Sequence, residues 1–225
     1  MKSEELATAV GVVLRTRMRN VMQMLICAAF FTLHSSLFTS CSESDDEAAD
    51  EYANWQVRND AFFLTLEDSL SASPGTWVKW KTFAKDANTT GNNTDYVYAK
   101  LIEKGEGMTS PLYTDTVRIA YRGRLIPSAS YSQGYVFDQT YVGNFSMTTT
   151  DVANNVVSGY VEGFATALQH MHAGDHYCIY IPYDLGYGTS ASGSIPAYST
   201  LIFDVVLIDF VTGSDQLVPW SARRL

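Results

Sequence analysis

Three histidines near residue 170 are the side chains in this sequence best suited to hold a metal ion. His170, His172 and His176 lie close together, and neutral imidazole is a common ligand of transition metals. The alternative interpretation is that imidazoles near the end of a helix complement the negative end of its dipole. We favour this alternative, so we predict that the chain holds no metal and no cofactor.

Other groups that could do chemistry have no recognisable arrangement. The glycine- and serine-rich segment 188–193 is not followed by the lysine of a phosphate-binding loop, and it is not a nucleophile elbow. The carboxylates are scattered without a pair placed for acid–base work. The informative pattern lies instead in aromatic and apolar residues near the C-terminus.

Two neighbouring segments carry this pattern. Residues 181–188 read Ile-Pro-Tyr-Asp-Leu-Gly-Tyr-Gly, and residues 194–205 read Ser-Ile-Pro-Ala-Tyr-Ser-Thr-Leu-Ile-Phe-Asp-Val. They resemble the C-terminal half of the FKBP-type peptidyl-prolyl cis-trans isomerases, with its Ile-Pro-x-x-Leu-x-Tyr-Gly turn and its closing Leu-x-Phe-Asp-Val strand. Further family motifs are matched upstream in the same order, by Val117-x-Ile119-x-Tyr121-x-Gly123, Phe137-Asp138, residues 159–164 and residues 168–174. The resemblance covers roughly residues 95–211.

The resemblance implies a pocket that needs neither a nucleophile nor a proton shuttle. Rotation about an X–Pro bond breaks amide resonance, which costs about 18–20 kcal/mol. A dry aromatic cup favours the twisted amide, because this form is less polar than the planar one. By resemblance, Phe164 forms the floor of the cup and Ile195 lines its rim. The walls implied by the resemblance are Tyr121, Phe137 and Phe203.

The resemblance also implies polar groups around this cup. The backbone N–H of Val161, next to Tyr160, and the hydroxyl of Tyr187 are expected to bind peptide carbonyls. Asp138 is expected to lie beside the amide and to orient neighbouring side chains. The alternative for each aromatic residue is that it only fills the core of a small β domain. The set in family order favours the pocket.

The sequence departs from the family pattern at two rims of the pocket. Family members have a strand before the helix that adds an aromatic wall, whereas segment 144–158 is longer and polar, with Ala153 or Asn155 in the aromatic places. The spacing of Phe145 does not suit it to replace them, and the family's histidine before Ile195 is absent. We therefore weigh two functions. One is an isomerase that assists the folding of secreted or envelope proteins, and the other is a non-catalytic binding or chaperone module.

Hydrophobic periodicity predicts the elements that would position these residues. Residues 52–70 have helical spacing and 77–83 alternate as a strand, which gives an N-terminal extension ahead of the main domain. Its aromatic residues are expected to pack on the larger domain or on a second copy. A further hypothesis is that residues 52–83 form a dimerising arm.

From residue 95 onward the pattern is mostly that of strands. They are predicted at 97–103, 116–125, 176–181 and 201–210, with one amphipathic helix at 163–172. In the second strand Val117, Ile119 and Tyr121 share one face, and arginines occupy the other, which predicts a solvent-exposed face. The predicted fold class is α+β, an antiparallel twisted sheet wrapped over one short helix.

The first forty residues have the features of a secretory signal. Three arginines, at 15, 17 and 19, precede an apolar stretch over 21–38, which is too short and too polar to predict a membrane-spanning helix. Residues 37–41 read Leu-Phe-Thr-Ser-Cys and resemble a bacterial lipobox, which implies lipidation of Cys41. The alternatives are an ordinary cleaved signal or a buried apolar helix. We predict a lipoprotein anchored in the bacterial cell envelope, at the outer membrane.

Composition limits the remaining possibilities. The formal net charge is −9, which argues against a nucleic-acid-binding protein. Three cysteines exclude a disulfide framework, and Cys178 is expected to be a small buried residue. The partners we expect are proline-containing polypeptides and, through the lipid, a membrane. The predicted organisation is a signal peptide at 1–40, an acidic tether at 41–51, the extension at 52–94, the isomerase domain at 95–211 and a C-terminal tail at 212–225.

Overall fold

The structure, a computed structural model, describes residues 51–146, 150–213 and 215–220. The predicted signal peptide, the lipidation site at Cys41 and nearly all of the acidic tether lie outside these residues. In the part that is described, no helix is both long and apolar enough to cross a membrane. Cys178 is buried and free, as the sequence predicted.

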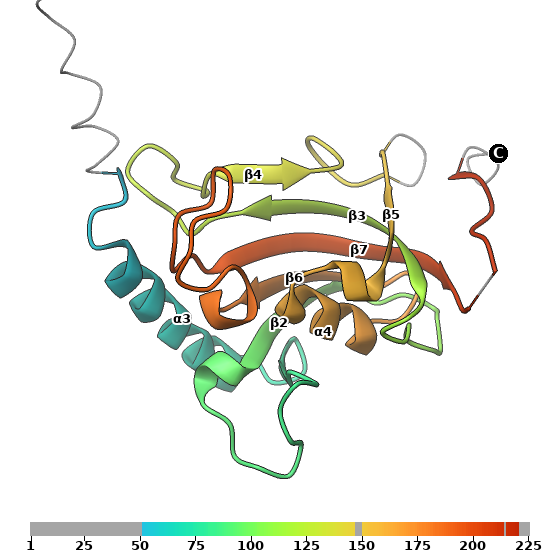
Figure 1. The fold of residues 1–225 in the computed structure, drawn as a ribbon, viewed down its shortest axis with the longest axis horizontal. Helices are drawn as coiled ribbons and strands as arrows, with labels where there is room; N and C mark the ends of the chain where they lie inside the picture. The colour runs from blue at the N-terminus through green and yellow to red at the C-terminus, as the bar shows by residue number, and fades with distance from the viewer. Residues whose placement is uncertain (1–50, 147–149, 214, 221–225) are drawn as a thin grey trace, which may run out of the picture. The chain divides into compact units, whose positions relative to one another are not determined.

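Two helices and seven strands make up the described part of the chain (Figure 1). The helices are α3 (Trp55–Ala72) and α4 (Glu162–His170). Single turns of 3-10 helix lie at Asn93–Asp95, Val157–Gly159 and Tyr183–Leu185. The strands are β1 (Trp77–Lys81), β2 (Tyr96–Glu103), β3 (Thr116–Arg124), β4 (Val136–Gln139), β5 (Ala153–Val156), β6 (His176–Ile181) and β7 (Leu201–Val211).

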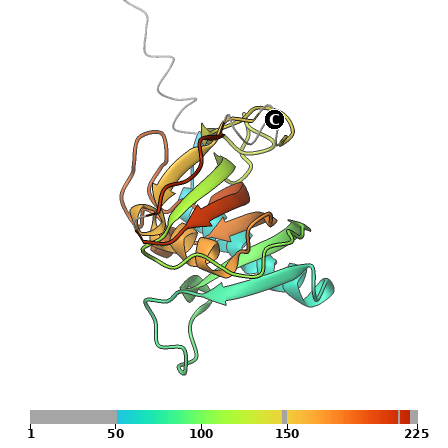
Figure 2. The same cartoon turned by 90° about the vertical axis from the view of Figure 1, so that its right-hand side faces the viewer.

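All seven strands join one antiparallel sheet, which confirms the α+β prediction. The order across the sheet is β1-β2-β6-β7-β3-β4, and β5 pairs with the first half of β3, on the same edge as β4. Figure 2 views the sheet from the side, with β1 at its lower edge. The helix α4 packs against one face of the sheet, and its Phe164 and Leu168 enter the main hydrophobic core. Residues from β2, β3, β6 and β7 complete this core.

The N-terminal extension is part of the same sheet. Apolar residues at helical spacing form α3, which ends just before Pro74-Gly75. The strand β1 then pairs with β2. The rings of Phe63 and Tyr98 meet edge to face with centroids 5.1 Å apart, so α3 covers the face of the sheet opposite α4. Of the two placements expected for the aromatic residues of the extension, the structure shows packing on the larger domain.

A second group of residues covers the same face of the sheet beside α3. Ala120 of β3 and Val206 and Ile208 of β7 are buried there. The chain between β4 and β5 and the segment near the C-terminus supply the cover. The covering residues are Tyr141, Phe145, Val152 and Trp220.

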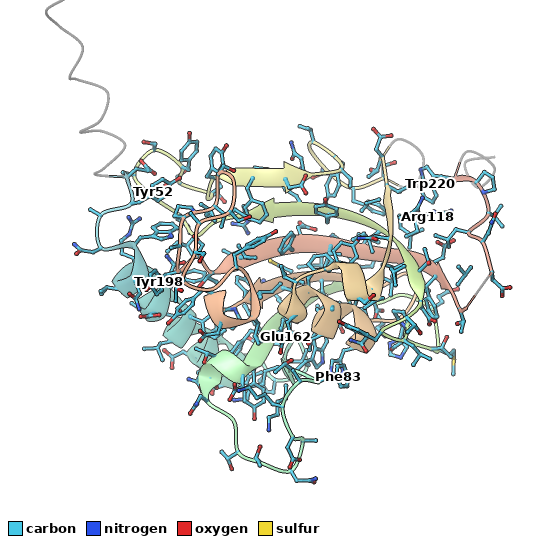
Figure 3. All side chains as sticks on the ribbon, in the orientation of Figure 1. Tyr52, Phe83, Arg118, Glu162, Tyr198 and Trp220 are labelled. Carbon is cyan, nitrogen blue, oxygen red and sulfur yellow. The ribbon has the colours of Figure 1, made fainter. Side chains whose placement is uncertain are left out.

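Arg118 contradicts the solvent-exposed face predicted for β3. The side chain is only 1% exposed. Its guanidinium donates hydrogen bonds to Asp209 at 3.1 Å and to Asn154 at 3.2 Å. It also donates to the Val218 carbonyl and lies 5.4 Å from the centre of the Trp220 ring (Figure 3). The prediction was wrong at this position because residues near the C-terminus fold back over the strand.

Candidate active site

One cavity of about 330 Å³ brings together eight of the nine residues that the sequence predicted for the pocket. The ninth, Val161, contributes no side chain to the lining. Residues 192–194 of the loop before β7 close one side. The eight lining residues are Tyr121, Phe137, Asp138, Tyr160, Phe164, Tyr187, Ile195 and Phe203.

Phe164 lies at the base of this cavity. It projects from the first turn of α4, is only 2% exposed, and packs with the core that α4 shares with the sheet. Its ring centroid lies 4.7 Å from that of Phe203, 4.9 Å from that of Tyr160 and 6.2 Å from that of Tyr121. The predicted floor residue is therefore fixed from three sides by other rings.

The walls come from adjacent strands, and a glycine lets them meet. The rings of Phe137 on β4 and Phe203 on β7 contact each other edge to face, with centroids 5.4 Å apart. Gly123 on β3 lies between them, opposite Phe203 and Asp138 in the sheet. A Cβ at Gly123 would lie 2.5 Å from Cε2 of Phe137 and 2.6 Å from Cε1 of Phe203. The sequence motif included Gly123 but did not predict that it separates these two rings.

Hydrogen bonding joins the polar groups at the cavity. The hydroxyl of Tyr121 donates to Oδ2 of Asp138 at 2.6 Å. Burial, followed by this hydrogen bond, raises the pKa of Tyr121 well above its usual value. Burial, followed by the charge of Asp138, raises the pKa of Tyr160 to about 12. Both phenols therefore keep their protons at neutral pH and can act as donors.

Three groups at the cavity can donate a hydrogen bond to a ligand. The Tyr160 hydroxyl is buried and has no hydrogen-bond partner among the residues described. The backbone N–H of Val161, directly before α4, likewise donates to no acceptor in the described part of the chain. An N–H at a helix start lies at the positive end of the helix dipole, so it favours an electron-rich oxygen. Tyr187, the third donor, is 42% exposed.

The loop over residues 188–200, which carries the rim of the cavity, is held by α3. Oδ1 of Asn59 accepts the Thr200 N–H at 2.8 Å. Nδ2 of the same side chain donates to the Trp55 carbonyl at 2.8 Å, and the Trp55 indole N–H donates to Oγ of Ser199 at 2.8 Å. All four residues are buried. Sequence reasoning missed this support, although Asn59 stands four residues after Trp55 in the apolar stripe of the helix.

None of the described residues between 144 and 158 supplies the aromatic wall expected before the helix. Ala153 and Asn155, which stand in the corresponding places of the sequence, lie on β5, and Asn155 is exposed. The ring of Phe145 lies 6.1 Å from that of Tyr141 and 6.4 Å from that of His176, on the opposite face of the sheet. Phe145 thus does not replace the wall, in agreement with its spacing.

The three histidines point to different surroundings. His170 is stacked between Trp80 and Phe83, with ring centroids 5.2 Å and 5.0 Å away. His172 and His176 lie beside two separate carboxylates. They therefore do not converge on one site, and the described residues contain no group of three potential metal ligands.

Similarity to known proteins covers the residues that form this cavity. The profile of the FKBP-type peptidyl-prolyl cis-trans isomerases matches residues 107–208. The chain is 36% identical over 155 residues to the FKBP-type 22 kDa peptidyl-prolyl cis-trans isomerase of Escherichia coli, covering 68% of each protein. It is 40% identical over 113 residues to the macrophage infectivity potentiator of Trypanosoma cruzi, covering 50% of this chain and 52% of that protein.

A third relative is similar over a shorter share of its length. The chain is 37% identical over 110 residues to the outer membrane protein MIP of Legionella longbeachae, covering 48% of this chain and 42% of that protein. The chain therefore spans about half of the Trypanosoma protein, and less than half of the Legionella one.

Proposed function

Because the chain belongs to the family of FKBP-type peptidyl-prolyl cis-trans isomerases, we propose that its aromatic cavity catalyses cis-trans isomerisation of X–Pro bonds in polypeptides. The observation that carries the proposal is the contact of Phe164, Phe203 and Tyr121 around a space of about 330 Å³. This volume is at the lower end of the range for small-ligand pockets, and it suits a proline ring with its flanking amide.

The cavity lowers the barrier through differential solvation and hydrogen bonding. The planar X–Pro amide is more polar than the twisted one, so transfer from water to a site walled by aromatic rings favours the twisted form. The ring of Phe164 supports the proline, because it is buried and cannot move away. No nucleophile and no proton transfer are required, since only a torsion angle changes.

Donors around the cavity hold the substrate chain in place. The Val161 N–H and the Tyr187 hydroxyl bind the carbonyls on either side of the proline, which fixes the backbone while the amide turns. The bond from Tyr121 to Asp138 holds that carboxylate at the rim of the cavity. In this position Asp138 orients the neighbouring phenols and leaves the proline slot apolar.

The second candidate function is a binding or chaperone module without turnover. The replacement of the aromatic wall by Ala153 and the exposed Asn155 favours it, because water that reaches the amide through this side stabilises the planar form. The candidates differ in one measurable property, which is whether the rate of X–Pro rotation rises when the protein is added.

A protease-coupled assay on an Ala-Ala-Pro-Phe anilide separates the two functions. We expect Tyr187→Phe to lower kcat/KM about fivefold, the value of one neutral hydrogen bond of about 1 kcal/mol. We expect Phe164→Ala to abolish activity. The control is Leu168→Ala, one turn further along α4 and equally buried. It also removes a core side chain but leaves the lining of the cavity unchanged, so it should keep its activity. A wild-type rate equal to that of buffer leaves only the binding module.

We also propose that the chain is a lipoprotein of the bacterial envelope, at the outer membrane, where it assists the folding of exported polypeptides. The arginines, the apolar stretch and Cys41 support this location, and so does the name of the Legionella longbeachae relative. Labelled palmitate is expected in the wild-type chain and not in Cys41→Ala. A dimer through residues 52–83 stays a prediction that sedimentation of the purified protein tests.

A further inference from the structure

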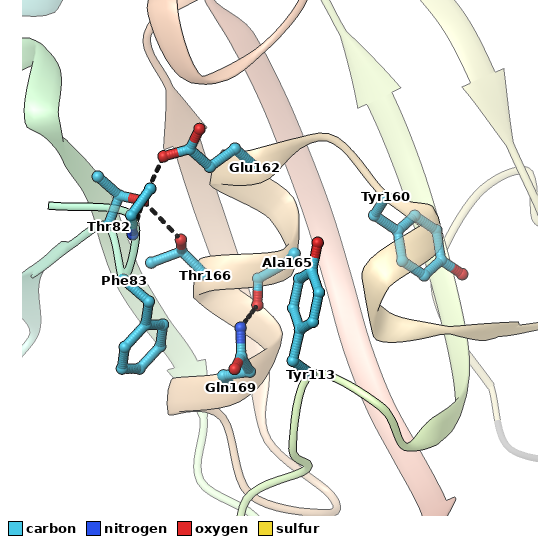
Figure 4. Close-up of a pocket in the computed structure, with 9 residues that line it drawn as sticks. Thr82, Phe83, Tyr113, Tyr160, Glu162, Ala165, Thr166 and Gln169 are labelled. Atoms are coloured by element: carbon cyan, nitrogen blue, oxygen red, sulfur yellow. Dashed lines mark hydrogen bonds between the residues drawn. The ribbon is translucent and has the colours of Figure 1, made fainter.

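A second cavity, of about 490 Å³, lies on the outer side of α4 (Figure 4). Four parts of the chain form it: residues 82–84 after β1, Tyr113 before β3, Tyr160, and one side of α4. Thr82 donates a hydrogen bond to the Glu162 carboxylate at 2.5 Å across one side of this space. Nothing in the isomerase mechanism uses this cavity.

Two aromatic rings at the second cavity are unusually exposed. Phe83 is 60% exposed and Tyr113 is 55% exposed, and large apolar side chains grouped in this way mark interaction surfaces. The ring of Phe83 is nevertheless fixed, because it stacks on His170, with an angle of 12° between the rings, and His170 stacks in turn on Trp80. The Tyr113 carbonyl accepts the Ser158 N–H at 3.0 Å. A preformed surface of this kind loses little entropy on binding.

The second cavity borders the candidate active site. Tyr160 lines both cavities. The Val161 N–H, the donor proposed to bind a substrate carbonyl, lies in the chain between Tyr160 and Glu162, and both of these residues line the second cavity. A peptide held by this N–H therefore runs past the boundary between the two cavities.

We propose that the second cavity binds a large apolar side chain of the same substrate polypeptide, at a residue outside the X–Pro pair. This inference rests on the proposed function, which it deepens by assigning a substrate class. The substrate is an unfolded chain in which an aromatic or large aliphatic residue lies a few positions from proline. Phe83 and Tyr113 contact that side chain. The Glu162 carboxylate at the rim disfavours an acidic residue in the same place, since like charges repel.

Two sets of ten-residue peptides with a single Ala-Pro bond test this proposal. In one set a phenylalanine occupies each position from two to five residues before or after the pair, and in the other set alanine occupies that position. Exchange measured by NMR gives kcat/KM without a protease that could cleave at phenylalanine. We expect one position at which phenylalanine raises kcat/KM about tenfold, which corresponds to about 1.4 kcal/mol. This gain is expected to come from a lower KM with an unchanged kcat, because the side chain binds equally before and during rotation.

The readout for variants is the ratio of kcat/KM between the phenylalanine and alanine peptides. In the combined variant Phe83→Ala, Tyr113→Ala we expect this ratio to fall to about one. Tyr131→Ala removes another exposed tyrosine, one that lines neither cavity, and it keeps the wild-type ratio. A wild-type ratio near one at every position overturns the proposal, as does a tenfold ratio that survives in the combined variant.

Failure of the proposed function gives a different result. If no peptide is isomerised, the isomerase proposal is wrong. The dissociation constants of the same peptides then test whether the second cavity binds an apolar side chain. A tenfold tighter binding of one phenylalanine peptide that is lost with Phe83 and Tyr113 supports the second cavity. Equal dissociation constants for all the peptides refute it.

Discussion

The role of Gly123 gives a quantitative test of how the walls of the cavity are built. In Gly123→Ala the new Cβ would lie 2.5 Å from Phe137 and 2.6 Å from Phe203, whereas ordinary contacts begin at 3.4 Å. To restore ordinary contact, the ring of Phe137 must therefore retreat by about 0.9 Å and that of Phe203 by about 0.8 Å. Both rings line the cavity, so the shift changes the shape of the space in which the amide would turn.

The expected cost has two separate parts. Overpacking of a formed core costs about 1–3 kcal/mol, which lowers the melting temperature by about 2–4 °C for each kcal/mol in a chain of this size. A displacement of about 1 Å at an active site can lower turnover about 100-fold. We expect Gly123→Ala to lose at least tenfold in kcat/KM while it remains folded at 25 °C, because the loss of stability is smaller than the total of a typical domain.

The control separates the shape of the cavity from stability. Val117→Ala deletes a fully buried side chain from the same strand, and Val117 does not line the cavity. It is expected to destabilise the protein by a similar amount with unchanged kcat/KM. Melting curves and the peptide assay are measured on both variants. A Gly123→Ala protein that is destabilised and isomerises X–Pro bonds at the wild-type rate would refute this account of the walls.

Three further predictions concern residues outside the cavity. Arg118→Met removes the buried guanidinium that pairs with Asp209 and should lower the free energy of unfolding by about 3 kcal/mol in urea. Arg122→Met, partly exposed on the same strand, should cost less than about 1 kcal/mol. Burial lowers the pKa of His170, so this imidazole is protonated more readily in the unfolded chain than in the folded one. Its contribution to the free energy of unfolding is therefore complete above about pH 6.5 and is lost as the pH falls towards the folded-state pKa. His170→Phe should therefore flatten the fall in stability between pH 7 and pH 5, and an unchanged slope contradicts the assignment. Asn59→Leu removes the acceptor of the Thr200 N–H and should raise KM severalfold with little change in kcat; an unchanged KM would contradict a role of α3 in holding the rim.

The cavity residues were predictable because they stand in motifs that resemble those of the family, and several of them also follow a regular hydrophobic pattern. Phe164 belongs to the apolar stripe of an amphipathic helix, and Tyr121 and Phe203 lie in strands with clear alternation or a long apolar run. Local periodicity and the order of the family motifs therefore place these side chains, and the antiparallel sheet brings them together.

The features that the sequence did not predict depend on contacts between distant parts of the chain. Arg118 is covered by Trp220 and by the carbonyl of Val218, about a hundred residues away. A local sequence pattern cannot predict burial by residues so distant in the chain. The second cavity joins Phe83, which lies just beyond the end of β1 although the predicted strand included it, to Tyr113 from the loop before β3. Asn59 did leave a signal, since a polar side chain in an apolar helical stripe requires a buried partner.

The pairing of β1 with β2 also limits where the protein can be divided. The region of family similarity, residues 107–208, begins after β2 and excludes α3. A fragment cut there would lose β1 and β2 and expose the backbone of β6, and such free edges recruit other chains into aggregates. For laboratory expression, the smallest unit that keeps every strand of the sheet paired and α3 on its face therefore starts near Glu51, well ahead of the residues that the family profile matches.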